Sequence, residues 1–274
     1  MASSKISRIA AIYDERSSKY DESFHPRQAE DFIKWAELQP GQNVLDLCCG
    51  TGLVTLPAKQ AVGDQGRVIG VDVSNQMLDQ ARRKAAAAEL DITFINGDVT
   101  TLKRQDLSLQ DGQYFDLITC ASAFVLLEDP VGALRQWATH LSPTGRLIID
   151  VPTETSMVVG SLLEKLLGDS ASPLYGRRGV TSVSSLEDAI RNAGLSPIRI
   201  FETDSYGATQ ESAKDARTFF DKWVRYTESG DIPDPELKES LVCKFQEIMN
   251  EAADSSGIIH DDIRFNVAIA GKDS

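Results

Sequence analysis

Cysteine, histidine and long apolar runs are scarce in this 274-residue sequence, and each scarcity excludes a class of function. The four cysteines, Cys48, Cys49, Cys120 and Cys243, show no C-x-x-C spacing, so we expect neither a metal site nor a thioredoxin-type motif. Three of them fall in or beside apolar strand-like runs, which predicts buried, reduced thiols in a reducing compartment. No stretch approaches the roughly 18 apolar residues of a membrane span, so we expect no membrane association.

Basic residues are also few. The 28 lysines and arginines face 41 aspartates and glutamates, which gives a formal net charge of −13. Such a chain repels phosphate backbones, and the basic runs at 82–84 and 177–178 are too short to reverse that effect. We therefore expect no nucleic-acid partner, and no feature of the sequence indicates an obligatory protein partner.

The first twelve residues lack the apolar core of a secretory signal. They contain Lys5 and Arg8 and no acidic residue. This composition leaves a short mitochondrial transit peptide open as an alternative to the cytoplasmic location that we expect.

Regular alternation organises residues 44–150. Short apolar runs alternate there with amphipathic stretches, which is the pattern of βαβ units and a parallel sheet. Ser74 is placed to cap the alanine-rich helix that follows it. The predicted strands are 43–47, 67–71, 92–95, 115–120 and 146–151, and the predicted helices are 53–61, 75–89 and 132–140, with a turn at 142–145.

The rhythm changes after Pro152. Helices are predicted at 157–167 and 186–193, and late strands at 197–203 and 263–270. Two helical patterns, 212–228 and 235–253, separate those strands. An insertion of that size should lie outside the sheet, so we expect a single domain over 1–274 with a helical cap at approximately 205–260.

The first candidate site is a tight turn of small residues that follows the strand beginning at Val44. Gly50 and Gly52 would let the backbone approach a ligand, and the next helix would direct its N-terminal amides toward it. The third glycine of the G-x-G-x-x-G dinucleotide fingerprint is missing, which argues against a nicotinamide-dependent oxidoreductase. Asp46 would repel a pyrophosphate and favour a cationic ligand such as S-adenosylmethionine.

Two further acids follow strand ends. Asp72 ends the second predicted strand and is placed to accept hydrogen bonds from ribose hydroxyls. Asp98 follows the third strand and is placed to accept from an adenine amino group, with Val99 and Met77 on the two faces of the ring. One strand-end aspartate is usually a turn residue, but three in order at successive strand ends indicate one nucleoside-binding site.

Together these residues resemble the class I S-adenosylmethionine-dependent methyltransferases, and the N-terminal pairs Tyr13-Asp14 and Tyr20-Asp21 are similar to the UbiE-like branch. The resemblance covers roughly residues 10–152 and the final strand. It implies a Rossmann-like α/β fold with a seven-stranded, mostly parallel sheet whose last strand is antiparallel. The motifs that carry it are Asp46 with 50–52, Asp72, Asp98, the strand 115–120 and the turn 141–147.

The resemblance also implies the cofactor S-adenosylmethionine and an N-terminal lid, 1–40, in which Tyr20 closes over it. Cys48 stands where the family has the first glycine of its motif. Either the thiol contacts the cofactor or a small residue is tolerated there, and we favour the second. The implied cofactor-binding residues are Tyr20, Asp46, Cys48, Gly50, Gly52, Asp72, Val73, Met77, Asp98, Val99 and Ala121.

Few side chains are available to deprotonate a methyl acceptor. His25 is the best candidate for a catalytic general base, with a surface histidine before Pro26 as an equal alternative. Glu128 and Asp129 follow the fourth strand and could also reach the pocket. A sparse set of bases fits an acceptor that ionises easily, as thiols do near neutral pH.

A finer resemblance is to fungal thiol methyltransferases of the gliotoxin bis-thiomethyltransferase type, which methylate both thiols of a reduced dithiol-diketopiperazine. It implies an apolar, aromatic acceptor pocket. We expect two of the three residues in the helical stripe Phe219, Trp223 and Tyr226 to belong to the core. The candidate substrate-binding residues are Phe24, Phe124, Tyr175 and Trp223.

Three functions stay open for a small-molecule partner. S-adenosylmethionine-dependent S-methylation of a dithiol natural product is preferred. C- or O-methylation of a quinone or phenolic precursor is the alternative. A cofactor-binding regulator without catalysis is the least favoured, and turnover of S-adenosylmethionine would exclude it.

Overall fold

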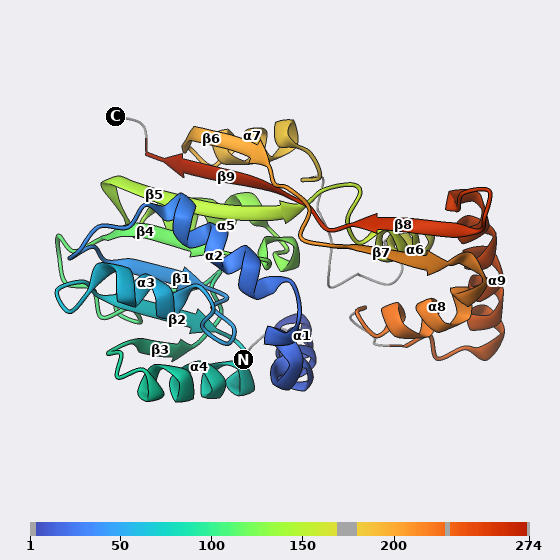
Figure 1. Cartoon of the computed structure of the whole chain (residues 1–274), viewed down its shortest axis with the longest axis horizontal. Coiled ribbons are helices and arrows are strands. Elements are labelled where there is room, and N and C mark those ends of the chain that lie inside the picture. Colours follow the sequence, from blue (N-terminus) through green and yellow to red (C-terminus); the bar gives the residue numbers. More distant parts are fainter. Residues whose placement is uncertain (1–3, 169–179, 228–230, 273–274) are drawn as a thin grey trace.

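The computed structural model describes residues 4–168, 180–227 and 231–272. Its main feature is a seven-stranded sheet in the order β3-β2-β1-β4-β5-β9-β6 (Figure 1). β9 is antiparallel to β5 and β6, and the other pairings are parallel, which confirms the predicted fold class. The strands are β1 (Val44–Leu47), β2 (Val68–Asp72), β3 (Thr93–Asn96), β4 (Phe115–Cys120), β5 (Leu141–Pro152), β6 (Ser196–Glu202) and β9 (Phe265–Gly271).

Helices cover both faces of this sheet. Alternate residues of one strand face opposite layers, so Leu45 joins the core that contains Trp137, and Val44 joins the core that contains Phe32. Burial on both faces explains why the central strands read as continuous apolar runs. The covering helices are α2 (His25–Ala36), α3 (Thr55–Val62), α4 (Asn75–Ala87), α5 (Pro130–Ala138) and α7 (Val183–Asn192).

Two local predictions have clear outcomes. The Ser74 hydroxyl accepts a hydrogen bond from the Met77 backbone N–H at 3.1 Å, which confirms the predicted helix cap. The separate turn at 142–145 is wrong, because β5 already begins at Leu141. Phe115 of β4 pairs with Leu141, and Leu117 pairs with Arg146. Residues 142–145 therefore form an irregularity in the pairing of β5 with β4, and the pairing resumes after it.

A second body of secondary structure, which we call the cap, comprises the described residues 158–167, 208–227 and 231–262. It contains α6 (Val158–Leu167), β7 (Ala208–Ser212), α8 (Ala216–Val224), α9 (Pro235–Ala252) and β8 (Ile258–Asp262). The cap contains the two predicted helices and, in addition, an antiparallel ribbon of β7 and β8 that carries the insertion away from β6 and β9 (Figure 1). α6 joins it from outside the insertion, and Leu163, Phe220 and Phe245 pack in a separate apolar core.

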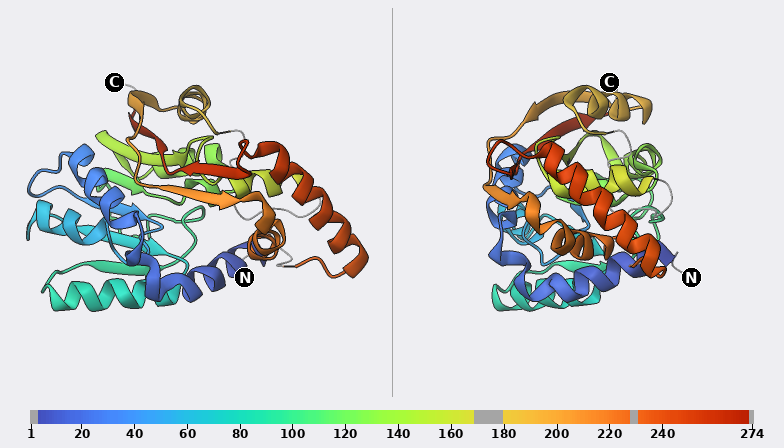
Figure 2. Two further views of the ribbon diagram at one scale, coloured as in Figure 1. Left: turned by 45° about the vertical axis from the view of Figure 1, so that its right-hand side comes forward. Right: turned by 90° about the vertical axis from the view of Figure 1, so that its right-hand side faces the viewer.

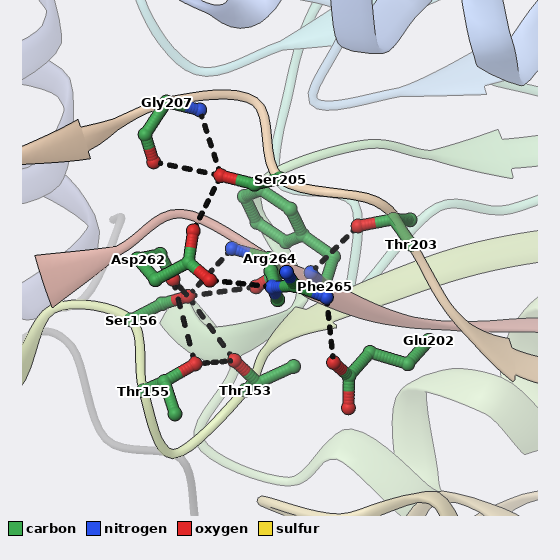
Figure 3. Close-up of polar contacts among 10 residues, drawn as sticks. All are labelled: Thr153, Thr155, Ser156, Glu202, Thr203, Ser205, Gly207, Asp262, Arg264 and Phe265. Atoms are coloured by element: carbon green, nitrogen blue, oxygen red, sulfur yellow. Dashed lines mark hydrogen bonds and ion pairs between the residues drawn. The ribbon is translucent and has the colours of Figure 1, made fainter.

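A polar junction connects the cap to the main sheet (Figure 3). The buried Ser156 hydroxyl lies 2.8 Å from the carbonyl oxygens of Asp262 and Arg264 and accepts from the Arg264 N–H at 2.8 Å. The Asp262 carboxylate accepts from the Ser205 hydroxyl and from Arg264 Nε, the latter at 2.5 Å. These contacts tie the chain leaving β5 to the strand that runs from β8 into β9.

The N-terminal segment, α1 (Ser4–Arg16) and η1 (Ser17–Glu22), connects the two bodies. Figure 2 shows α1 running from beside α4 toward α8. Asp14 accepts from the Ser74 hydroxyl at 2.6 Å on the sheet side, and Arg8 donates to the Arg225 carbonyl at 3.0 Å on the cap side. Among the described residues, no helix combines the length and apolar character needed to cross a membrane.

Candidate functional site

Three adjoining hollows lie at the carboxyl ends of β1, β2 and β4, and we call them together the trough. Their volumes are about 30, 40 and 470 Å³, and all three are lined by Cys48. Tyr20, Gly50 and Ala121 line both small hollows. The large hollow extends from Cys48 and Val73 to the N-terminus of α5. One continuous surface thus follows the edge of the sheet where parallel strands place ligand-binding groups.

The structure brings ten of the eleven predicted cofactor residues to the trough. Asp46 lines the smallest hollow, Asp72 lines the middle hollow, and Asp98 lines the large hollow. The residues that line the trough as expected are Tyr20, Asp46, Cys48, Gly50, Asp72, Val73, Met77, Asp98, Val99 and Ala121.

Gly52 is the exception. It lines none of the three hollows. Its φ of +85° suits glycine, and a Cβ there would lie 2.4 Å from Leu56 Cδ1 and 3.3 Å from Ala81 Cβ. Gly52 therefore lets α3 and α4 approach each other, and its contact with a cofactor stays a prediction.

The strand-end carboxylates are held by short hydrogen bonds. Asp46 is 1% exposed and accepts from the Thr55 hydroxyl at 2.5 Å and the Thr119 hydroxyl at 2.8 Å. Burial raises the pKa of Asp46 to about 6. Asp72 accepts from the backbone N–H groups of Gly50 and Ser74, each at 2.8 Å. Burial also raises the pKa of Asp72. These bonds fix the direction of each carboxylate beside the trough.

Cys48 lies at the centre of the trough with a left-handed backbone, φ +55°. This conformation favours glycine, the residue that the family resemblance implies at this position. Hydrogen bonding with Cys48, and then burial, raises the pKa of the Cys120 thiol. Cys48 therefore lines the trough and also packs against the main apolar core. Contact between its thiol and the cofactor stays a prediction.

A buried polar network at the smallest hollow was absent from the sequence prediction. The Ser122 hydroxyl donates to Gln28 Oε1, and Gln28 Nε2 donates to Asp150 Oδ2 at 2.5 Å. The Ser122 N–H donates to Asp150 Oδ1 at 2.7 Å. Burial raises the pKa of Asp150 to about 7. The one signal available in the sequence is an acid within the apolar strand 146–151.

A fourth cavity of about 300 Å³, the aromatic cavity, lies between the main sheet, α1 and the cap. It shares His25 and Ser122 with the smallest hollow of the trough, so the two spaces meet there. Its wall is largely aromatic and apolar and includes three charged side chains. The lining residues are Tyr13, Arg16, Phe24, His25, Ser122, Val125, Pro152, Met157, Thr209, Lys222, Trp223, Tyr226, Asp261, Ile263 and Phe265.

The predicted substrate residues divide between cavity and core. Phe24 and Trp223 line the aromatic cavity. Phe124 does not: it is 2% exposed and packs edge-on against Trp137, with ring centroids 6.2 Å apart. Sequence cannot distinguish the two sides of a strand end, and the adjacent Val125 faces the cavity instead. Tyr175 lies outside the described residues.

The aromatic stripe on α8 also divides between cavity and core. Phe219 is buried in the cap core. Trp223 and Tyr226 line the aromatic cavity, with ring centroids 5.4 Å apart. Trp223 also packs against the cap core, so the prediction that two of the three belong to the core holds for Phe219 and in part for Trp223.

His25 occupies the meeting point of the two spaces. Its ring stacks between Tyr20 and Phe24, each with centroids 4.1 Å away, and its Nδ1 lies 2.5 Å from the Ser23 hydroxyl. The side chain keeps some solvent exposure, yet burial by these rings, with the nearby charge of Arg16, lowers the pKa of His25 to about 3. The imidazole is neutral at physiological pH but is a weak proton acceptor.

Glu128 and Asp129 lie away from the aromatic cavity. Both line the large hollow beside Asp98 and Val99. Asp129 caps α5 by accepting from the Gly132 N–H at 2.8 Å. Neither residue is therefore placed to deprotonate a molecule in the aromatic cavity.

Comparisons with known proteins match this geometry. Residues 44–145 match the family described as "Methyltransferase domain". The demethylmenaquinone methyltransferase of Shouchella clausii (strain KSM-K16) is 30% identical over 185 residues, which are 65% of this chain and 76% of that protein.

Solved structures share the fold at low identity. The YcgJ protein from Bacillus subtilis is 18% identical with a TM-score of 0.58, over 90% of this chain and 99% of that one. A SAM-dependent methyltransferase from Thiobacillus denitrificans, in complex with S-adenosyl-L-homocysteine, is 17% identical with a TM-score of 0.53, over 90% and 92% of the two chains. With its sheet order, its strand-end carboxylates and its coverage of the Shouchella relative, the chain belongs to the class I S-adenosylmethionine-dependent methyltransferases, and its cofactor is S-adenosylmethionine.

Proposed function

We propose that this small-molecule methyltransferase methylates the thiols of a reduced dithiol natural product, such as a dithiol-diketopiperazine like reduced gliotoxin. The observation that carries the proposal is the wall of the aromatic cavity. Arg16 and Lys222 line it, whereas His25 is a weak base and Asp261 already accepts two backbone N–H groups of α6. A cavity with cations and poor bases suits an acceptor that ionises by itself near neutral pH, and a thiol does so.

The trough has the residues that the cofactor requires. Acids stand at the ends of two neighbouring strands, Asp72 for ribose hydroxyls and Asp98 for the adenine amino group. Met77 and Val99 supply apolar surface for the ring. Gly50 has φ +54°, and a Cβ on it would have Tyr20 Cε1 as its nearest neighbour at 3.9 Å, so the backbone can approach the methionine end. The residues present therefore fit S-adenosylmethionine.

The protein's own contribution is placement. S-adenosylmethionine supplies an electrophilic methyl group on a sulfonium. His25 and Ser122 line the point where trough and aromatic cavity meet, so an acceptor there lies beside the cofactor space. Aromatic walls exclude water and orient the acceptor, and such alignment supplies a large share of the rate of a bimolecular displacement.

The domain organisation follows the same logic. We assign two parts of the chain to closure of the site: the cap, and the predicted N-terminal lid as far as the structure describes it, residues 4–40. Tyr13 and Arg16 from α1 face Trp223 and Tyr226 of the cap across the aromatic cavity. Tyr20 lies over Gly50 at the trough. Both parts would then move for cofactor and acceptor to enter.

C-methylation of a quinone precursor is a second candidate. It is favoured by the similarity to a demethylmenaquinone methyltransferase and by the aromatic side chains of Trp223 and Tyr226 in the cavity wall. A quinol ring needs a deprotonated hydroxyl to become a good carbon nucleophile, and hydroxyls of that class ionise near pH 10, far above thiols. The weak bases of the cavity make this candidate second.

Turnover with labelled S-adenosylmethionine tests the proposal. The acceptor panel contains reduced dithiols, simple monothiols, phenols and quinols, each measured from pH 6 to 9. Methyl-sulfur products from dithiols are expected, and products on carbon or oxygen alone would contradict S-methylation. No turnover with any acceptor would favour a cofactor-binding regulator.

A pair of aspartate variants assigns the cofactor site in the same assay. Asp72→Asn should raise the Kd for S-adenosylmethionine at least tenfold, because charge-assisted hydrogen bonds are stronger than neutral ones. Asp79→Asn is the matched control, since Asp79 is exposed on α4 and its ion pair is with Arg82 of the same helix. Equal affinities for both variants would contradict the ribose role of Asp72.

A further inference from the structure

We propose that the Ser122 hydroxyl accepts a hydrogen bond from the methyl acceptor where the trough meets the aromatic cavity, and that it selects thiols with a second O–H or S–H group beside the reacting sulfur. Gln28 and Asp150 are the positioning residues that give this hydroxyl its direction. The inference rests on the proposed S-methylation and adds the residue that recognises the acceptor. The class of ligand is a thiol with a neighbouring hydroxyl or thiol on one apolar body.

Ser122 lies between the space for the cofactor and the space for the acceptor. It follows the end of β4 by two positions and is half-buried. It lines the smallest and the middle hollows of the trough and also the aromatic cavity, and it is the one residue shared by all three. An acceptor that lies in the aromatic cavity beside the cofactor therefore contacts Ser122.

The backbone of Ser122 has a conformation that suits glycine. Its φ is +54°, in the left-handed region that a Cβ disfavours. Asp150 Oδ1 holds this turn by accepting a hydrogen bond from the Ser122 N–H at 2.7 Å. A serine at such a position is explained if its hydroxyl has a function in the site.

The hydrogen bonds of the buried network have one direction. A backbone N–H only donates and an ionised carboxylate only accepts, so Asp150 accepts from the Ser122 N–H and from Gln28 Nε2, the latter at 2.5 Å. Gln28 therefore turns its Oε1 toward the Ser122 hydroxyl, which donates its single proton there. Because that proton is used, Ser122 Oγ can only accept a hydrogen bond from a bound molecule.

Burial and three separate elements keep this direction fixed. Gln28 on α2 is 2% exposed and Asp150 on β5 is 1% exposed, so water does not compete for the hydrogen bonds between them. An O–H or S–H group of the acceptor satisfies Ser122 Oγ, whereas a methyl ether or thioether at the same place leaves it without a donor. For a dithiol, the first methyl transfer should therefore be faster than the second.

Matched pairs of acceptors test the inference. 2-Mercaptophenol and 2-methoxybenzenethiol differ in one O–H donor beside the thiol, and 1,2-benzenedithiol and its mono-S-methyl derivative differ in one S–H donor. The ratio of kcat/KM for S-methylation within each pair measures recognition of that donor. The assays are run at pH 8.5, where Asp150 is ionised, because its pKa is about 7.

Ser122→Ala should lower the ratio for the O–H pair about fivefold, the effect of one net hydrogen bond. The ratio for the S–H pair should fall less, because a thiol is a weaker donor. The bulk of the added methyl group is the same for both enzymes, so its effect cancels when the ratios are compared.

Two further variants separate the hydrogen bond from the stability of the fold. Ser122→Gly suits the left-handed backbone and keeps the N–H that donates to Asp150, and it should lose the same preference. Asp150→Asn removes no hydroxyl. Its Oδ1 accepts from the Ser122 N–H, so its Nδ2 faces Gln28, and the Gln28 amide turns over to donate to Ser122 Oγ. The Ser122 proton is then released, and the ratio should fall as in Ser122→Ala.

Ser108→Ala is the matched control, since Ser108 is an exposed serine with φ +50° that lines neither the trough nor the aromatic cavity. Unchanged ratios in Ser122→Ala and Ser122→Gly would overturn the inference and leave the proposed function standing. Equal losses for both members of each pair, together with weaker binding of S-adenosylmethionine, would also overturn it and assign Ser122 to the cofactor. Failure of the wild type to methylate any thiol would overturn the proposed function, and the inference with it.

Discussion

At the scale of single residues, His25 illustrates how neighbours decide chemistry. A histidine beside a methyl-transfer site would ordinarily be a candidate base, since its unperturbed pKa lies near neutrality. Here it is enclosed between Tyr20 and Phe24, and its pKa falls to about 3. A group whose conjugate acid is that strong accepts a proton poorly, so we assign His25 to the wall of the site.

His25→Phe tests this assignment, because it keeps an aromatic ring between Tyr20 and Phe24. We expect kcat with a thiol acceptor to fall less than about fivefold, whereas loss of a general base costs about 100- to 10,000-fold. The pH profile between 6 and 9 should keep its shape, since the imidazole is already neutral throughout that range. A loss near 100-fold with a vanished pH limb would restore His25 as the base.

Gly52 provides a second residue-scale test, this one of packing. Gly52→Ala should lower the free energy of unfolding by about 1 kcal/mol for its positive φ and by roughly 1–3 kcal/mol more for overlap with Leu56 and Ala81. Gly112→Ala is the control, because Gly112 has φ +79° and no atom within 4 Å of a Cβ. Equal losses in urea denaturation would contradict the packing role.

At the scale of elements, the N-terminal segment is a link between the cofactor trough and the cap. Asp21 accepts from the Thr51 hydroxyl at 2.5 Å and pairs with Lys84 of α4. Glu15 pairs with Arg225 of the cap at 3.1 Å. The N-terminal segment therefore contacts both the trough and the cap. We expect its contacts with the trough to be stabilised when the cofactor is bound.

Asp21→Asn should loosen the segment from the trough. We expect the Kd for S-adenosylmethionine to rise about three- to tenfold, and amide hydrogen exchange over residues 17–22 to accelerate. Glu22→Gln is the control, since it removes a neighbouring exposed acid. If both variants bind the cofactor equally well, the segment does not contribute to cofactor retention.

The junction between cap and sheet makes the second prediction at this scale. Ser156→Ala leaves the buried N–H of Arg264 without its acceptor and should cost about 1–3 kcal/mol of folding free energy. It should also raise the KM for acceptor, because the cap carries Trp223 and Lys222. Ser184→Ala, an exposed position on α7, should change neither quantity. If the KM for the acceptor is unchanged in Ser156→Ala, the junction does not determine the position of the cap.

At the scale of the whole molecule, the sequence predicted the sheet and the trough because their signals are local. Apolar runs mark each strand, and Asp46, Asp72 and Asp98 lie within, at the end of and just after their own strands. Groups that assemble across the chain were missed. Gln28 and Asp150 are separated by 122 positions, and the aromatic cavity is lined by residues as distant in sequence as Tyr13 and Trp223.

Aromatic residues show the limits of sequence prediction. The sequence predicts Phe124 in the pocket, whereas Phe124 is in the core, and Trp223 both packs against the cap core and lines the aromatic cavity. An aromatic side chain lowers its free energy in either setting, so residue type alone does not determine which side it faces. The direction that Phe124 faces follows from its packing against Trp137 of α5, a contact that residue type alone does not specify.

The most direct test of thiol methylation is an intramolecular competition. A mercaptophenol presents a thiol, a hydroxyl and ring carbons to the same site, so differences in binding cancel. After turnover with methyl-labelled S-adenosylmethionine at pH 7, mass spectrometry and NMR locate the methyl group. We expect methylation at sulfur. Methylation at a ring carbon or at the phenol oxygen would contradict the thiol assignment and leave a quinone-type acceptor as the better explanation of this cavity.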